Sequence, residues 1–152
     1  MKTLRFVVSL LVVALVSGCG MLNNEDLVGT YSVSGTGTMA FDGLHAMTSQ
    51  LDGAVTISEG VTSEFILTDP GTPNCIIPLN MQDGVARVTV GATCSMLMDD
   101  GVRITMTFTS GTATLNGQII QLTYSGTVNA VYDGDTYPGT FTTTATLTRV
   151  GK

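Results

Sequence analysis

The fold of this chain is decided by residues 118–132, QIIQLTYSGTVNAVY. Apolar side chains occupy every second position from Ile120 to Tyr132, the side chains between them are polar except for Val131, and Gly126 lies in the apolar row. A period of two is typical of a β-strand with one buried face and one solvated face. We interpret Gly126 as a bend, because a glycine inside a strand often marks one.

The segments on both sides of this stretch alternate in the same way. Residues 102–108 place apolar side chains at every second position, and in residues 140–149 the inward row alternates with threonines. Beyond residue 108 the apolar positions change phase, since the next ones are Ala113 and Leu115. A one-residue β-bulge near Gly111 produces that change without ending the strand.

Turn signals separate the alternating segments at regular intervals. They are Asp52-Gly53, Glu59-Gly60, Asp83-Gly84, Asp100-Gly101, Asn116-Gly117 and Asp133-Gly134. A series of such pairs indicates an antiparallel meander. Threonine, valine and glycine, which suit strands and turns, are abundant. We expect the first strand from Leu27 to about Ala40, whereas residues 42–51 are compatible with a short helix, a loop or a strand.

The expected fold is therefore all-β, with about eight to ten strands, several of them longer than is usual. Long strands that bend at glycines and bulges allow one sheet to close on itself. We predict a single antiparallel meander β-barrel, whose closure removes the exposed edges of the sheet. A β-sandwich of two packed sheets is the alternative.

The amino terminus has the pattern of an export signal. Lys2 and Arg5 precede an apolar run from Phe6 to Val16, and small residues follow at Ser17 and Gly18. This order of charge, apolar run and small residues is typical of a secretory signal peptide. The run is too short for a transmembrane helix, which needs about 20 apolar residues.

The end of this run, Val16-Ser17-Gly18-Cys19, resembles the bacterial lipobox. The resemblance implies that residues 1–18 are a cleaved signal peptide and that the sulfur of Cys19 receives lipid, with palmitate among the acyl chains. Residues 19–26 are then the lipidated cysteine and a tether, and residues 27–152 form the β-barrel domain. Because Gly20 rather than aspartate follows the cysteine, the resemblance implies the outer membrane, on its periplasmic or surface side, if the source has one.

The charge of the mature chain restricts its partners. Cleavage leaves 134 residues with twelve acidic and four basic side chains, which is a formal charge of −8. Nucleic acids and anionic lipid surfaces require basic patches, so neither is an expected partner. A basic protein partner or a cation is compatible with this charge, and so is a simple role in solubility.

Cys75 and Cys94 are the two cysteines of the domain. An even number of cysteines in an exported protein predicts a structural disulfide. The pair flanks the turn signal Asp83-Gly84, which sets residue 75 opposite residue 92 and makes Cys94 a diagonal neighbour on the same face. A bulge at Gly91 would shift that register. Two buried free thiols are the alternative.

The sequence contains no evident catalytic or metal-binding constellation. His45 is the only histidine, and we interpret it as a loop residue because no nucleophile motif accompanies it. Zinc usually requires several His or Cys ligands. The carboxylates of Asp99-Asp100 and Asp133-Gly134-Asp135 fall on turn signals, where aspartate is favoured by backbone geometry. We therefore expect no enzyme activity, no cofactor and no metal.

Both ends of the domain resemble a known family. Leu27-Val28-Gly29-Thr30-Tyr31 is similar to the Leu-x-Gly-x-aromatic start of lipocalin-like, calycin-type barrels. Leu147-Thr148-Arg149 is similar to the last strand of small bacterial lipoproteins with such barrels. The tryptophan that lipocalins carry after the glycine is absent, and Tyr31 stands in that area. The resemblance implies a non-catalytic barrel.

The expected function is that of a membrane-anchored, non-catalytic binding or structural protein, with a small apolar ligand as one candidate. Met96, Met98 and Met106 suit either an adaptable apolar pocket or an irregular core, and a small barrel is either packed inside or holds one small ligand. The alternative is a protein-binding module, such as an inhibitor of a basic envelope-directed enzyme. Small lysozyme-inhibitor lipoproteins have a comparable barrel, although their Ser-Gly-x-x-Tyr element is absent here.

Overall fold

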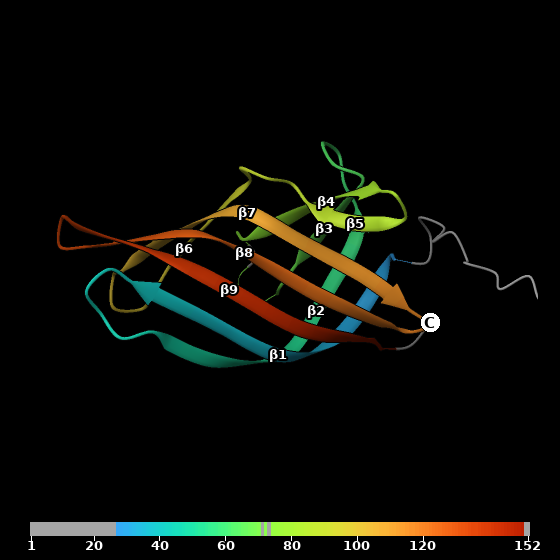
Figure 1. Ribbon diagram of the computed structural model, residues 1–152, viewed down its shortest axis with the longest axis horizontal. Coiled ribbons are helices and arrows are strands. Elements are labelled where there is room, and N and C mark those ends of the chain that lie inside the picture. The colour runs from blue at the N-terminus through green and yellow to red at the C-terminus, as the bar shows by residue number, and fades with distance from the viewer. Residues whose placement is uncertain (1–26, 71, 73, 151–152) are drawn as a thin grey trace, which may run out of the picture.

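The computed structural model describes residues 27–70, 72 and 74–150 (Figure 1). The predicted signal peptide 1–18, the lipidation site Cys19 and the tether 19–26 lie outside the described residues, as do residues 151–152 of the predicted domain. None of the described residues belongs to a helix that is long and apolar enough to cross a membrane.

Nine antiparallel strands follow one another along the chain. They are β1 (Gly29–Phe41), β2 (Met47–Glu59), β3 (Phe65–Thr68), β4 (Ile76–Gln82), β5 (Val85–Val88), β6 (Thr93–Leu97), β7 (Arg103–Asn116), β8 (Ile119–Tyr132) and β9 (Asp135–Arg149). The order in the sheet is β5-β4-β3-β2-β1-β9-β8-β7-β6, and β5 also pairs with β7. The predicted all-β antiparallel meander is thus confirmed, and the sheet closes in a ring.

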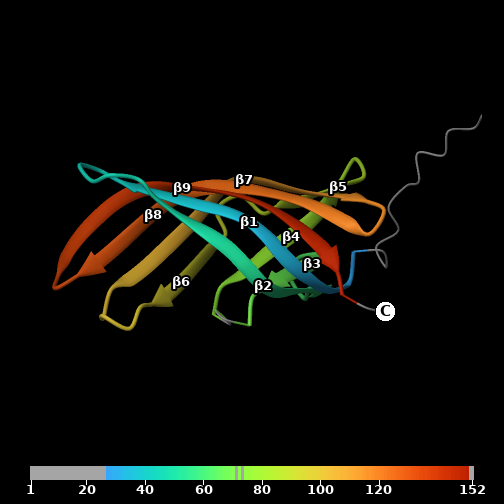
Figure 2. The same cartoon turned by 90° about the horizontal axis from the view of Figure 1, so that it is seen from below.

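The ring closes over only part of the length of the strands. The closing pairs are Ala86 with Ala113 and Arg87 with Thr112, because β5 has only four residues. On the other side, the four residues of β3 pair only with Thr56–Glu59 of β2. The hairpins β1–β2, β8–β9 and β6–β7 therefore extend beyond the ring, as the left side of Figure 1 and the second view in Figure 2 show.

We call this extension the open half: residues 37–53, 93–108 and 126–143. Its strand order is β2-β1-β9-β8-β7-β6, so the first half of β2 and the whole of β6 are its two edges. The beginning of β1 and the end of β9 pair with each other at the opposite end of the molecule, where Tyr31 faces Arg149. The chain therefore enters and leaves the domain at the ring.

The core lies on the inner face of the sheet. The predicted inward rows are buried: Ile120, Leu122 and Val128 on β8, and Phe141, Thr143, Ala145 and Leu147 on β9. Phe108, Tyr124 and Phe141 meet edge to face, with ring centroids 5.5–6.1 Å apart. Such aromatic contacts stabilise a core beyond the effect of buried area alone.

Gly126 lies where this aromatic cluster meets the backbone. A Cβ atom at Gly126 would lie 2.0 Å from the carbonyl oxygen of Thr107 and 2.8 Å from the ring of Phe141. Glycine is therefore required here by close approach, whereas the predicted bend at Gly126 stays a prediction.

Two details of the predicted strands change. The bulge in β7 falls at Thr109, between Phe108 and Ser110, two residues before the predicted position at Gly111. Asp52-Gly53 is not a turn, because Gly53 pairs with Val33 inside β2. Gly53 has a positive φ of 125°, which explains why glycine is found at this position although the chain does not change direction.

Two further predictions concern the ends of hairpins. Tyr132 belongs to the inward row, yet it is 52% exposed, because the hairpin β8–β9 extends beyond the packed core at this point. Residues 42–51, which were compatible with several structures, form the turn of the hairpin β1–β2 and the beginning of β2.

Candidate binding site in the open half

Methionine side chains line the inner face of the open half near both of its edges. Met39 on β1 pairs directly with Met47 on β2, while Met96 on β6 pairs with Ile104 on β7, next to the pair Cys94–Met106. Alternation along the strands places all of these residues in the inward rows. We call Met39, Met47, Met96, Met98 and Met106 the methionine face. The sequence alone indicates only Met96, Met98 and Met106. Met39 and Met47 join them because β1 pairs with β2, which the sequence alone does not show.

This face becomes more exposed toward the ends of the hairpins. Met106 is 7% exposed, whereas Met98 is 47% and Met47 is 59% exposed. Of the twelve exposed large apolar side chains among the described residues, seven lie in the open half: Met47, Met98, Tyr132 and Tyr137 toward its inner face, Leu44 in the β1–β2 turn, and Leu97 and Val131 on its outer face beside Arg103. Exposed apolar residues that gather at one place mark an interaction site more often than scattered ones do.

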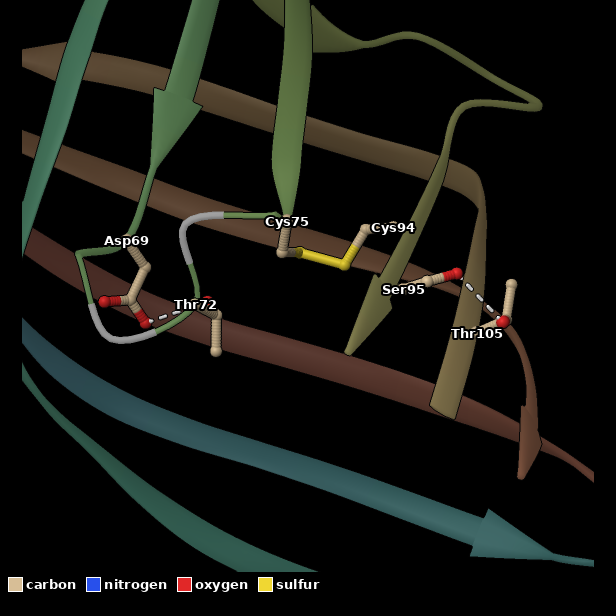
Figure 3. The surroundings of a disulfide bond; sticks show 6 residues. All are labelled: Asp69, Thr72, Cys75, Cys94, Ser95 and Thr105. Carbon is tan, nitrogen blue, oxygen red and sulfur yellow. Dashed lines mark hydrogen bonds between the residues drawn. A yellow bond between two sulfur atoms is a disulfide. The ribbon is translucent and has the colours of Figure 1, made fainter. Parts of the chain in front are cut away.

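A disulfide closes the border between the ring and the open half (Figure 3). Cys75 and Cys94 are joined, with their Cα atoms 4.6 Å apart, as predicted. The predicted register is wrong, because Cys94 is not a diagonal neighbour within one hairpin. The chain turns at Thr89–Ala92, where Gly91 has a φ of 82°, and Cys94 then belongs to β6, which pairs with β7.

The disulfide therefore ties the start of β4 to β6, two strands between which no backbone ladder forms. Beside it lies an open depression of about 280 Å³. Its walls come from the β3–β4 loop and from β6 with the turn that follows: Thr72, Asn74, Cys75, Ser95, Met96, Leu97, Met98 and Asp99. Thr72 donates a hydrogen bond to Asp69 in that loop, at 3.4 Å.

Acidic residues lie in the hairpin turns at the end of the molecule that carries the exposed part of the methionine face. The turns of the three hairpins bring Asp42, Asp99, Asp100, Asp133 and Asp135 to the same end of the molecule, and all are exposed. Asp52 lies on the outer face of β2. Arg103 is the basic residue of the open half, whose formal charge is therefore −5 with His45 neutral. The sequence predicted each of these turns, but it did not predict that they lie at the same end of the molecule.

The residues weighed for catalysis do not form a site. His45 is exposed in the turn between β1 and β2. Among the described residues there is no group of three or more His, Cys, Asp or Glu that could hold a metal ion. Asp100 accepts a hydrogen bond from the backbone N–H of Val102 at 3.2 Å, which is the local role expected of an aspartate in a turn.

The outer face of the sheet is rich in hydroxyl groups. In one row across β1, β9, β8 and β7, threonines stand side by side at positions 36, 144, 123 and 112. Thr112 and Thr123 share a hydrogen bond of 3.1 Å, and Ser110 and Ser125 share one of 2.8 Å. A depression of about 460 Å³ lies among these residues, and Arg87 is the charged side chain in its lining.

Tyr124 is a core residue whose pKa is raised. Burial raises the pKa of its phenol above the ordinary value of 10.0, and a hydrogen bond with Thr143 acts in the opposite direction. The negative charge of Asp69 raises the pKa further. Tyr124 is thus a neutral, protonated phenol at physiological pH.

The two segments that resemble calycin-type barrels meet at the ring end. Arg149 lies over the ring of Tyr31, 5.3 Å from its centroid, and donates a hydrogen bond to its hydroxyl at 2.9 Å. The same hydroxyl donates to the carbonyl of Leu27 at 2.7 Å. Comparison of the chain with protein-family models, with curated proteins and with solved structures finds no match.

Proposed function

We propose that this chain is a lipid-anchored, exported protein whose domain binds an apolar group without catalysing a reaction, on the methionine face of the open half. One observation carries the binding part of the proposal: Met47 and Met98 are about half exposed at the hairpin ends of the open half, where the inner face of the sheet continues beyond the packed core. Methionine side chains are flexible and polarizable, so they suit a surface that adapts to an apolar ligand.

Two observations support the anchor. The disulfide uses both cysteines of the domain, which is typical of proteins in oxidising compartments outside the cytoplasm. Cys19 is then the third cysteine of the chain, at the end of a segment that resembles a lipobox. Two acyl chains are sufficient for stable membrane attachment, since each buried CH₂ contributes about 0.8 kcal/mol.

The anchor is tested by expression of the full chain in a bacterial host supplied with labelled palmitate. We expect the label on the protein, a mature form that begins at residue 19, and loss of both in Cys19→Ser. Cys75→Ser is the matched control, because it also removes a thiol but should keep the label. An unlabelled protein with an intact amino terminus would contradict the proposal.

The binding surface is tested with Nile red, a neutral apolar dye, and the mature chain carrying Cys19→Ser. We expect the dye to bind, and Met47→Gln combined with Met98→Gln to weaken its affinity about tenfold, which corresponds to about 1.4 kcal/mol. Val61→Gln is the control, because Val61 is fully exposed outside the open half. Equal affinities in the two variants would contradict the proposed site.

A further inference from the structure

The charge and the shape of the open half indicate which kind of molecule binds to the methionine face. This inference rests on the proposed function. We infer that the face receives a basic amphipathic helix of a partner protein, with the apolar side of the helix on the methionines and its basic side chains near the aspartates of the turns.

The arrangement of the methionines favours a thick occupant. Met47 lies on one edge strand of the open half and Met96 on the other, while Met39 and Met106 lie between these edges. An extended peptide added to β6 would reach only that edge. The six strands of the open half span about 24 Å along the sheet, at about 4.8 Å per strand spacing. A helix of about 18 residues is about 27 Å long, so a helix laid across the strands can contact both edges and the strands between them.

The charge favours a basic occupant. Six aspartates and one arginine give the open half a formal charge of −5, and the aspartates of the three turns are exposed at the same end of the molecule as Met47 and Met98. Complementary charges accelerate encounter and exclude partners of the same sign. A second copy of this chain and an anionic membrane both carry the wrong charge for this surface.

The position of the site also favours a partner that approaches from the side away from the anchor. β1 begins at the ring end, and its thirteen residues separate Gly29 from the turn at Asp42 (Figures 1 and 2). At about 3.3 Å per residue this is about 40 Å. Seven residues lie between Cys19 and Leu27, and the eight Cα–Cα steps from one to the other span at most about 28 Å.

The experiment measures binding to the mature chain carrying Cys19→Ser by calorimetry and circular dichroism. The probe is a synthetic peptide of about 18 residues, long enough for a stable helix, with leucine on one helical face and lysine on the other. We expect saturable binding with a gain of helix signal. A peptide of the same composition in scrambled order, and one with glutamate in place of lysine, should bind at least tenfold more weakly.

Charge variants then locate the contact. Asp99→Asn combined with Asp100→Asn should weaken the peptide about tenfold and reduce the dependence of its affinity on salt. Asparagine can still accept the hydrogen bond from Val102, so the turn is preserved. Asp83→Asn combined with Glu59→Gln is the control, because it removes one charge from the β4–β5 turn and one from the end of β2, both outside the open half, and should change nothing.

The outcomes separate this inference from the proposed function. If Nile red binds on the methionine face but the basic peptide does not, or the scrambled peptide binds equally well, the inference is wrong and the function stands. If neither probe binds, both are wrong. Preferential binding to lipid vesicles, or a dimer that is lost in Met47→Gln combined with Met98→Gln, would also overturn the inference.

Discussion

Gly126 shows how a single residue sets the shape of this sheet. Its missing side chain allows the backbone of β7 and the ring of Phe141 to approach, so that the long strand β8 packs closely across the core. The alternation of residues 118–132 predicted the buried row from the sequence alone, because the side-chain period of a strand is independent of its neighbours. The contact with Thr107 was not predictable, since it depends on the register between two strands.

Replacement of Gly126 by alanine should therefore destabilise the fold. The added Cβ would overlap a backbone oxygen, which cannot move without a shift of the strand, so we expect a loss of about 3 kcal/mol in the free energy of unfolding. Gly37→Ala is the control, because a Cβ at Gly37 meets its nearest atoms at 3.7 Å. Urea unfolding measures both, and equal stabilities would contradict the packing described here.

Tyr124 makes the stability depend on pH at the alkaline end. Its pKa is raised in the folded state, chiefly by burial. The unfolded chain therefore ionises first, near pH 10, and the contribution of Tyr124 to stability is complete below that pH and is lost as the pH rises through the folded pKa. We expect the unfolding free energy of Tyr124→Phe to fall less between pH 9 and 11 than that of the wild type, as measured by urea unfolding. Parallel curves would contradict this origin.

At the scale of the elements, the turns were more predictable than the pairings. Asp83-Gly84 and Asp133-Gly134 are two-residue hairpin turns in which both residues have positive φ, from 50° to 88°, and this turn type is encoded locally. Asp52-Gly53 has the same sequence signature but lies within β2. The signature failed there because the residues on both sides of Asp52-Gly53 pair with β1, so the strand continues instead of turning.

The disulfide between β4 and β6 replaces a missing ladder. It joins residues 19 apart in the sequence, and closure of a loop of that length in the unfolded chain corresponds to about 3 kcal/mol of stabilisation. We expect Cys75→Ala combined with Cys94→Ala to lose about that amount in urea unfolding. Cys19→Ser should lose nothing, and added reductant should affect only chains that retain the disulfide. Equal stability with and without the disulfide would contradict its structural role.

The whole molecule is a closed ring continued by an open half, and this division was not predictable from the sequence. The alternating segments predict strands, but whether the sheet closes along its full length depends on the short strands β3 and β5 and on where they pair. The methionine face follows from the same division. Met39 and Met47 are more than forty residues from Met96 in the chain, and only the meander order brings them to one inner face.

The most direct test of this account is an NMR titration of the mature chain carrying Cys19→Ser, labelled at the methionine methyl groups, with the basic amphipathic peptide and with monomeric dodecyl maltoside as the neutral alkyl probe. We predict that the signals of Met39, Met47, Met96 and Met98 shift together on saturation with at least one of these ligands. The signal of Met81 in the ring strand β4 should stay in place. Shifts at Met81 alone, or no shift at any methionine, would contradict the claim that the open half is the binding surface.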